Sequence, residues 1–395
     1  MKKLDLVILA GGVGSRIKRH LSGRPKPMLE FNNKNFLNYV INNFSKYNFN
    51  KIFIITRYKS HIIHKKFHNK EFNFTNIECI KEKKKMGTGG ALNLVKKKVN
   101  DFILTNGDTI FDIDIISFIK KIKKNSLGKL SLRKNTNQKS NKLNKLGLKN
   151  DYIYYSDKGK FMNGGVYFFK KKFLNLIPNK ECSLENDILP KLISRKRING
   201  HVFNNFFIDI GSESFLKKAP KMLLKKFSKK AVFLDRDGVI NHDYGYVHSL
   251  KNFKFKNGVM KGLSLLTKKN YLIFIVTNQA GIGKKIFSLN QFKKLHIELK
   301  RKFLEKKIFI HEVKYSPYHK DAKFLIYKKK SKFRKPGNLM IESLFKNWDI
   351  QRKNSFMIGD KKSDYLAAKK SNLNWGELHS GSIIKDHLPL FPRLN

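Results

Sequence analysis

The chain has 395 residues, which at roughly 100–200 residues per domain predicts two or three domains. Its hydrophobic content of 41% is enough to bury a core and excludes a fully disordered protein. Lysine and arginine number 84 against 29 acidic residues, so the net charge is +55. Such an excess suggests nucleic acid or an anionic membrane, but the lysines are spread from end to end. We therefore expect neither a specific nucleic-acid partner nor a membrane partner.

The chain also lacks the sequence features of membrane and secreted proteins. No apolar run approaches the ~18 residues that a membrane span needs. The apolar stretch Leu6–Ala10 runs into two glycines and is too short for a secretory signal. Two cysteines, Cys79 and Cys182, cannot form a disulfide framework or a cysteine-rich zinc site. We expect a cytoplasmic protein.

Short apolar runs alternate with longer amphipathic ones, a pattern typical of buried parallel strands in an α/β fold. The expected strands are Leu6–Ala10, Ile52–Thr56, Phe102–Thr105, Val166–Phe169, Ala231–Leu234, Leu272–Val276 and Ser355–Ile358. Helical spacing of apolar residues occurs at Ala91, Leu92, Val95 and Val99, and at Leu289, Phe292, Leu295 and Leu299. The polar segment Asn135–Asn150 is expected to be an exposed loop.

Glycine- or aspartate-containing loops follow the first strand of two separate α/β series, one after Ala10 and one after Leu234. A basic amphipathic stretch at residues 217–230 lies between the series. The sequence therefore predicts a first domain over residues 1–220, a linker over 221–229 and a second domain over 230–395.

The first loop reads Leu-Ala-Gly-Gly-Val-Gly-Ser-Arg over residues 9–16, and Arg-Pro-Lys-Pro-Met follows at 24–28. Glycines after a strand let the backbone approach phosphates and present N–H groups to them. Arg16 offers a planar fork of donors and Lys26 a compact charge. The spacing fits neither a dinucleotide-binding fold nor a P-loop.

This pair of motifs resembles the signature of sugar-1-phosphate nucleotidyltransferases. The resemblance continues in order through most of residues 4–220 and is strongest toward heptose-1-phosphate guanylyltransferases. It is carried by Gly-Thr-Gly-Gly-Ala at 87–91, Asn-Gly-Asp at 106–108, Tyr-Ser-Asp-Lys at 155–158 (with Asp for the usual Glu), Asn-Gly-Gly-Val-Tyr at 163–167, Ser-Leu-Glu-Asn-Asp at 183–187 and Asp-Ile-Gly at 209–211.

The resemblance implies a Rossmann-like, glycosyltransferase-A-like domain in which a sugar 1-phosphate attacks the nucleotide α-phosphorus and pyrophosphate leaves. Arg16 and Lys26 would hold phosphates, Asp108 and Asp209 would bind Mg²⁺, and Lys158 would meet the sugar phosphate. The remaining implied contacts are Gly11, Gly12, Gly14, Ser15, Gly87, Thr88 and Gly89 for the nucleotide, and Asn163, Gly164 and Glu185 for the sugar. The implied nucleotide is GTP.

Two carboxylates, Asp235 and Asp237, come directly after the expected strand Ala231–Leu234. One carboxylate can act as a nucleophile toward phosphorus and its neighbour as a general acid and base. Asp360 stands at another strand end, with Asp364 four residues on. Thr277 and Asn278 follow a third strand, and Arg334 and Lys335 supply cations. A metal is expected, because carboxylates alone would repel a phosphate.

This ordered set resembles the haloacid-dehalogenase-like (HAD-like) phosphatases across residues 230–373. The longer motifs at residues 235–241, 245–247 and 277–282 are most similar to those of heptose 1,7-bisphosphate phosphatases. Histidinol-phosphate phosphatases share much of this pattern and are the near alternative. The resemblance implies a parallel-sheet domain in which Asp235 attacks phosphorus and Asp237 protonates the leaving oxygen, then activates water. Asp235, Asp360 and the backbone carbonyl of Asp237 would hold Mg²⁺. Thr277, Asn278 and Lys335 would bind the phosphoryl group, and Arg334 would select the substrate.

One departure from that family concerns its zinc loop. The corresponding stretches, residues 316–319 and 331–334, contain no cysteine. We therefore expect Mg²⁺ in both domains and no zinc. Packing of Tyr318, Phe324, Leu325 and Tyr327 against the domain is expected to order the loop instead.

Together the two resemblances predict a bifunctional enzyme that makes a nucleotide-activated heptose from heptose phosphates and a nucleoside triphosphate. A different sugar nucleotidyltransferase paired with another phosphatase is one alternative. A basic nucleic-acid-binding protein and a scaffold with an inactive transferase half are others. The sequence leaves the sugar anomer, the nucleotide base and the oligomeric state open.

Overall fold

The computed structural model describes residues 4–120, 122–135 and 145–377. The chain divides into two compact units, one of residues up to 222 apart from 45–48, the other of residues 45–48 and those from 223 onward. The expected linker at 221–229 is largely helical, because α6 (Glu213–Phe227) runs through it. Among the described residues, no helix is long and apolar enough to cross a membrane.

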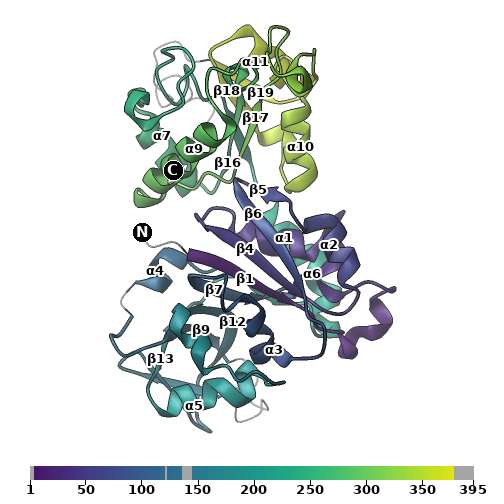
Figure 1. Ribbon diagram of the computed structural model, residues 1–395, viewed down its shortest axis with the longest axis vertical. Coiled ribbons are helices and arrows are strands. Elements are labelled where there is room, and N and C mark those ends of the chain that lie inside the picture. The colour runs from purple at the N-terminus through teal and green to yellow at the C-terminus, as the bar shows by residue number, and fades with distance from the viewer. Residues whose placement is uncertain (1–3, 121, 136–144, 378–395) are drawn as a thin grey trace. The chain divides into compact units, whose positions relative to one another are not determined.

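The first unit is built on a ten-stranded mixed sheet (Figure 1). Its parallel centre consists of β7 (Asp101–Asn106), β1 (Leu4–Ala10), β4 (Lys51–Thr56) and β6 (Thr75–Lys81), in that spatial order. The sheet continues past β6 with β5 (Glu71–Phe72) and past β7 with β12 (Phe161–Phe169), β9 (Gly128–Lys134), β13 (Ile198–Val202), β11 (Tyr152–Tyr155) and β10 (Leu146–Lys149).

Two expectations for this unit are corrected. The strand expected at Val166–Phe169 is not parallel, because β12 runs antiparallel to both β7 and β9. Its residues are nevertheless buried on both faces, and an apolar run of that kind does not reveal strand direction. The loop expected at Asn135–Asn150 contains β10, whose Leu146 is buried and pairs with Tyr155. Residues 136–144 of that segment lie outside the described residues.

Apart from α6, the helices of the first unit are short: α1 (Phe36–Phe44), α2 (Ser60–Phe67), α3 (Gly87–Gly90), α4 (Ile115–Ile119) and α5 (Leu189–Ser194). The helical pattern expected from Ala91 to Val99 is realised as a 3₁₀ helix, Ala91–Val95. Leu92 and Val95 in this helix and Val99 beyond its end are buried, as the pattern predicts. Two further strands, β8 (Thr109–Phe111) and β14 (Phe207–Asp209), form a small antiparallel sheet.

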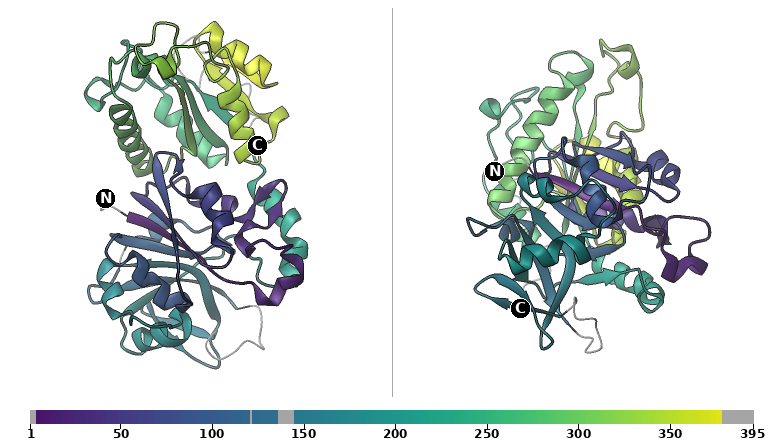
Figure 2. Two further views of the ribbon diagram at one scale, coloured as in Figure 1. Left: turned by 45° about the vertical axis from the view of Figure 1, so that its right-hand side comes forward. Right: turned by 60° about the horizontal axis from the view of Figure 1, so that its bottom comes forward.

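The second unit is a parallel five-stranded sheet with the order β17 (Glu312–Ser316), β16 (Leu272–Asn278), β15 (Ala231–Leu234), β18 (Phe356–Gly359) and β19 (Asn374–Glu377). Its main helices are α7 (Val259–Lys268), α9 (Leu289–Glu305), α10 (Leu339–Asn347) and α11 (Lys362–Lys370). Figure 1 and Figure 2 show α9 on one side of this sheet and α10 on the other. Strands β16 and β18 flank β15, so the chain order reverses there, and ligands bind at such switch points in open α/β sheets.

Phe274 on β16 lies at the centre of this core. Its side chain is fully buried, and its ring centroid lies 5.4 Å from that of Phe233 and 5.5 Å from that of Trp348. Truncation leaves a cavity, so Phe274→Ala should lower the free energy of unfolding by about 3–5 kcal/mol. Both tryptophans of the chain, Trp348 and Trp375, belong to this unit. Their fluorescence during urea unfolding therefore reports the second unit alone.

Leu325→Ala is the matched control, because Leu325 is 85% exposed. It should change the unfolding free energy by less than about 0.5 kcal/mol. Equal losses in the two variants would contradict the core described here.

Candidate functional sites

In the first unit, the ends of β1 and β7 bring a lysine and an aspartate together. Leu9 pairs with Asn106 in parallel register, and the Gly107 N–H donates to the Leu9 carbonyl at 2.8 Å. The loop that leaves β7 then presents Asp108. Lys26, which is 8% exposed, places its Nζ 2.5 Å from Asp108 Oδ2. The two motifs are therefore parts of one site, although they lie 82 residues apart.

Asp209 lies beside Asp108, because β14 pairs with β8 and aligns Asp209 with Thr109. Burial raises the pKa of Asp209, and the neighbouring Asp108 carboxylate raises it further, while Lys26 and Arg16 oppose the shift. Adjacent carboxylates that disfavour each other's charge are relieved by a divalent cation, and oxygen ligands suit Mg²⁺. The chemistry of this donor set thus fits the expected metal.

Gly211 shows how closely the charged groups gather. A Cβ atom at this glycine would lie 2.8 Å from Asp209 Oδ1, 3.2 Å from Lys26 Nζ and 3.5 Å from an Arg16 guanidinium nitrogen. Arg16, Lys26 and Asp209 thus converge on one point. The loop glycines Gly11, Gly12 and Gly14 with Ser15 lead from β1 toward it, and Gly14 has a positive φ of 66°.

A second group of side chains in this unit forms a continuous hydrogen-bond chain. Thr88 Oγ1 donates to Glu185 Oε2 at 2.6 Å, and Tyr167 OH donates to Glu185 Oε1 at 3.1 Å. Asn163 Nδ2 donates to Tyr167 OH at 2.7 Å, and the Gly165 N–H donates to Asn163 Oδ1 at 2.8 Å. The structure thus brings together three of the expected contacts, Thr88, Asn163 and Glu185. Tyr167 was missed as a site residue, although it closes the quoted motif.

The remaining expected residues of this unit play different parts. Gly87, with φ of 71°, lies where a Cβ would come within 2.4 Å of the Cys182 carbonyl, and the Gly89 N–H donates to that carbonyl at 2.9 Å. Gly164 is buried against Phe111. Lys158 is exposed in the turn after β11, and no contact among the described residues joins its side chain to the groups above.

In the second unit, the expected carboxylates meet at the carboxyl ends of β15 and β18. The Asp235 N–H donates to the Ile358 carbonyl at 3.0 Å, which fixes the first aspartate between the two strands. Lys335 Nζ lies 2.9 Å from Asp235 Oδ1 and 2.6 Å from Asp364 Oδ1, and it donates to the Val276 carbonyl at 2.8 Å. Lys335 is thus a buried cation between two buried carboxylates.

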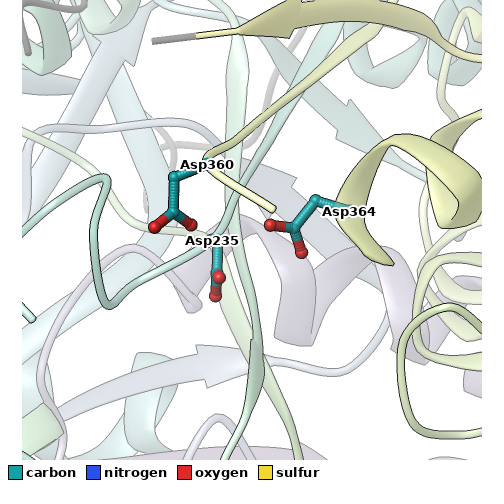
Figure 3. A group of neighbouring side chains, drawn as sticks. All are labelled: Asp235, Asp360 and Asp364. Atoms are coloured by element: carbon teal, nitrogen blue, oxygen red, sulfur yellow. The ribbon is translucent and has the colours of Figure 1, made fainter. Parts of the chain in front are cut away.

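Asp364 is a candidate site residue that sequence reasoning left without a role. Its position in the first turn of α11, four residues after Asp360, was the available signal. One carboxylate oxygen from each of Asp235, Asp360 and Asp364 lies within 4.8 Å of the others. Figure 3 shows the three carboxylates facing a common region.

The electrostatics of this cluster fit a hard cation. Burial raises the pKa of Asp235 although Lys335 opposes the shift, and desolvation together with the charge of Asp235 raises the pKa of Asp360 to about 6. Desolvation lowers the pKa of Lys335, but both aspartates outweigh it, so the pKa is raised overall. Lys335 contacts Asp364 and one oxygen of Asp235, Oδ1, so Asp235 Oδ2 and the oxygens of Asp360 are the ones best placed to bind Mg²⁺.

Gly238 permits the approach of the motif loop to this cluster. Its φ is 87°, and a Cβ there would lie 2.0 Å from Asp360 Oδ2. Asp237, one residue earlier, does not join the three-carboxylate group with its side chain. Its carboxylate instead accepts hydrogen bonds from Arg236 and from Gln279 Nε2, the latter at 2.8 Å.

Three expected phosphoryl or substrate contacts surround Lys335. Thr277 is buried, and its hydroxyl accepts from Gln279 Nε2 at 3.0 Å. The Asn278 side-chain amide donates to the Lys335 carbonyl and accepts from the Lys335 N–H, at 3.0 Å each. It therefore holds the loop that carries the lysine. Arg334 is half-buried, and its Nη1 has no hydrogen-bond partner among the described residues, which suits an anionic ligand.

The expectation that packing of four side chains orders this loop is wrong for Leu325, which is 85% exposed. Phe324 is 44% exposed but packs edge to face on Tyr327, with ring centroids 6.1 Å apart. Tyr318 and Tyr327 do pack edge to face, with ring centroids 5.6 Å apart. Backbone hydrogen bonds fix the loop, since the Lys323 and Phe324 N–H groups donate to the Gly283 carbonyl at 2.8 and 3.1 Å. Its tip therefore needs no apolar burial.

The raised pKa of Asp360 predicts how the stability of the metal-free protein changes with pH. A folded-state pKa of about 6 lies above the unfolded value, so stability is lost as pH rises through the interval up to 6. Asp360→Asn removes that loss. Because Asp360 is exposed, the gain at pH 7.5 should be at most about 1 kcal/mol, or about 2–4 °C in Tm.

Thermal unfolding in EDTA at pH 4 and pH 7.5 measures this effect. The variant should gain on the wild type only at the higher pH, and added Mg²⁺ should stabilise the wild type more than the variant. A gain of the same size at both pH values would contradict the electrostatic account.

Comparison with known proteins agrees with this geometry. Residues 6–142 match the Nucleotidyl transferase family and residues 230–375 match the Polynucleotide kinase 3 phosphatase family. The chain is 41% identical over 138 residues to D-glycero-beta-D-manno-heptose-1,7-bisphosphate 7-phosphatase of Haemophilus influenzae, covering 35% of this chain and 74% of that protein. It is 37% identical over 144 residues to D-glycero-alpha-D-manno-heptose-1,7-bisphosphate 7-phosphatase of Burkholderia mallei, covering 36% of this chain and 76% of that protein.

Among solved structures, HddC from Yersinia pseudotuberculosis is similar with a TM-score of 0.47 and 28% sequence identity, covering 55% of this chain and 98% of that chain. The phosphatase relatives are matched over roughly three quarters of their own length at more than 30% identity. The chain therefore belongs to the heptose-1,7-bisphosphate 7-phosphatase family and carries, ahead of that HAD-like domain, a nucleotidyl transferase domain.

Proposed function

We propose that this chain removes the 7-phosphate of D-glycero-D-manno-heptose 1,7-bisphosphate and then transfers a nucleotidyl group to the resulting heptose 1-phosphate. The observation that carries the proposal is the Asp235–Lys335–Asp364 arrangement, in a chain of this phosphatase family that also holds a nucleotidyl transferase domain. Relatives act on both the alpha and the beta sugar, so the anomer is left open. The proposed nucleotide is GTP and the proposed location is the cytoplasm.

In the phosphatase reaction, an Asp235 carboxylate oxygen forms a bond to phosphorus. The bond between phosphorus and the sugar oxygen breaks, and Asp237 gives that oxygen a proton. A water molecule then attacks the aspartyl phosphate, its proton passes to Asp237, and inorganic phosphate leaves with Asp235 restored. Lys335 lies 2.9 Å from Asp235 and offsets the charge that gathers on the transferring group.

Mg²⁺ held by Asp235 and Asp360 would supply further positive charge against the phosphate oxygens. Arg334 has a buried donor with no hydrogen-bond partner in the described part of the chain, so it would bind the second phosphate of the substrate. In the transferase reaction, a sugar 1-phosphate oxygen attacks the α-phosphorus and pyrophosphate departs. Arg16 and Lys26 hold phosphates, Asp108 and Asp209 would bind Mg²⁺, and the chain of Thr88, Glu185, Tyr167 and Asn163 orients the sugar.

The two activities should be separable, because the two sets of site residues never interleave in the sequence. Asp235→Asn should lower phosphate release roughly 10⁴-fold or more while pyrophosphate release from supplied heptose 1-phosphate continues. Asp108→Asn and Lys26→Ala should do the reverse. Asp321→Asn, at an exposed loop position, is the control that should leave both activities unchanged. Loss of both activities in one folded variant would refute the two-site proposal.

The phosphatase should need Mg²⁺ and no zinc. A structural zinc site takes four cysteine or histidine ligands, and His319 is the single such residue in the loop over 316–334. A zinc-selective chelator should therefore leave phosphate release intact, whereas removal of Mg²⁺ should stop it. Elemental analysis of tag-free protein checks the same point. One tightly held zinc per chain, lost together with activity, would overturn this assignment.

A further inference from the structure

Arg236, the residue between the two aspartates of the phosphatase motif, is completely buried. Its Nη2 lies 2.8 Å from both carboxylate oxygens of Asp237, and its Nε donates to Asp237 Oδ1 at 3.1 Å. A buried guanidinium costs several kcal/mol of lost hydration unless a carboxylate and further acceptors compensate. In this site the compensating carboxylate is Asp237, the proposed proton donor and acceptor.

The rest of the guanidinium is also held. Arg236 Nη2 donates to the Val247 carbonyl at 2.6 Å, and Nη1 lies 3.4 Å from His296 Nε2. Burial, together with the nearby Arg236, lowers the pKa of His296 well below its ordinary value, so its neutral ring can accept a hydrogen bond. The ring of Phe292, one helical turn earlier on α9, lies 5.8 Å from the guanidinium carbon. These neighbours contact the Arg236 guanidinium on the sides that Asp237 does not.

Asp237 receives two more donors from other parts of the domain. Asn241 Nδ2 donates to Asp237 Oδ1 at 3.0 Å, and Gln279 Nε2 donates to Oδ2 at 2.8 Å. Asn241 follows the motif loop and Gln279 follows β16, so separate segments fix the same carboxyl group. The Asp237 side chain is still 15% exposed and is therefore open on one side.

We propose that Arg236 is a positioning residue that, with Asn241 and Gln279, fixes the orientation of Asp237 for both proton transfers. This inference rests on the phosphatase function proposed above. A carboxyl group that must give a proton to a leaving oxygen and later take one from water gains most from a fixed place, because misplacement by about 1 Å can cost roughly a hundredfold in rate. Because the Arg236 guanidinium pairs with Asp237, the side-chain cation that pairs with Asp235 is Lys335.

A comparison of leaving groups tests this role. The sugar oxygen of heptose 1,7-bisphosphate needs a proton as it leaves, whereas the nitrophenolate of p-nitrophenyl phosphate leaves as a stable anion. Arg236→Lys should lower kcat roughly 100-fold on the sugar substrate and less than about tenfold on p-nitrophenyl phosphate, with little change in KM. Asp237→Asn should show the same preference. The double variant should be no slower than Asp237→Asn alone, because both changes remove one function.

Two further variants guard against a purely structural effect. Asn241→Ala weakens the same arrangement from another segment and should show the same leaving-group preference, even if Arg236→Lys fails to fold. Asp321→Asn, at an exposed loop position outside this hydrogen-bond arrangement, should keep the wild-type ratio of the two rates. Circular dichroism and Tm establish that each variant is folded.

Equal losses on both substrates, or losses that multiply in the double variant, would overturn the positioning role while leaving the phosphatase proposal intact. A folded wild-type protein that hydrolyses neither substrate would refute the phosphatase proposal itself, and the role of Arg236 with it.

Discussion

The candidate site of the second unit depends on three carboxylates that lie close together at the carboxyl ends of parallel strands. Asp235 and Asp364 are buried and Asp360 lies beside them, an arrangement that would be strongly unfavourable without compensation. Lys335 provides part of that compensation, with its ammonium group between Asp235 and Asp364. Asn278 in turn hydrogen-bonds the backbone of this lysine, and the Val276 carbonyl accepts a hydrogen bond from its ammonium group. The loop over residues 331–337 is therefore anchored by the contacts of Lys335 with the charge cluster and with Asn278.

The first unit reaches a similar arrangement with a different topology. Its two carboxylates, Asp108 and Asp209, come from a β7 loop and from the antiparallel strand β14, and Lys26 reaches Asp108 from a loop near the start of the chain. In both units a buried lysine and paired carboxylates surround the place where a phosphate is proposed to react. Positive charge close to developing negative charge is the main catalytic requirement of phosphoryl and nucleotidyl transfer. The large surface excess of lysine is a separate matter, because these site lysines are buried.

The sequence was informative wherever a motif and a strand end coincide. Asp235, Asp360 and Thr277 all follow apolar runs, so the parallel sheet gathers them, and Lys26 and Asp108 meet as their motifs suggested. Three features were missed in the sequence. The direction of β12 depends on its partners rather than its own residues. Tyr167 and Asp364 gain their roles from hydrogen bonds and ion pairs with residues distant in the chain. Leu325 can remain exposed because the N–H groups of Lys323 and Phe324 fix the loop to the Gly283 carbonyl. Side-chain patterns do not predict such backbone hydrogen bonds.

One chain is proposed to carry out two consecutive reactions, the first of which supplies the substrate of the second. The most direct measurement incubates the purified protein with heptose 1,7-bisphosphate, GTP and Mg²⁺ and follows inorganic phosphate and pyrophosphate separately in time. Phosphate should appear first and pyrophosphate should follow after a lag, and this lag should vanish when heptose 1-phosphate is supplied. Pyrophosphate release that precedes phosphate release, or phosphate release that never leads to pyrophosphate with any nucleoside triphosphate, would contradict this proposal.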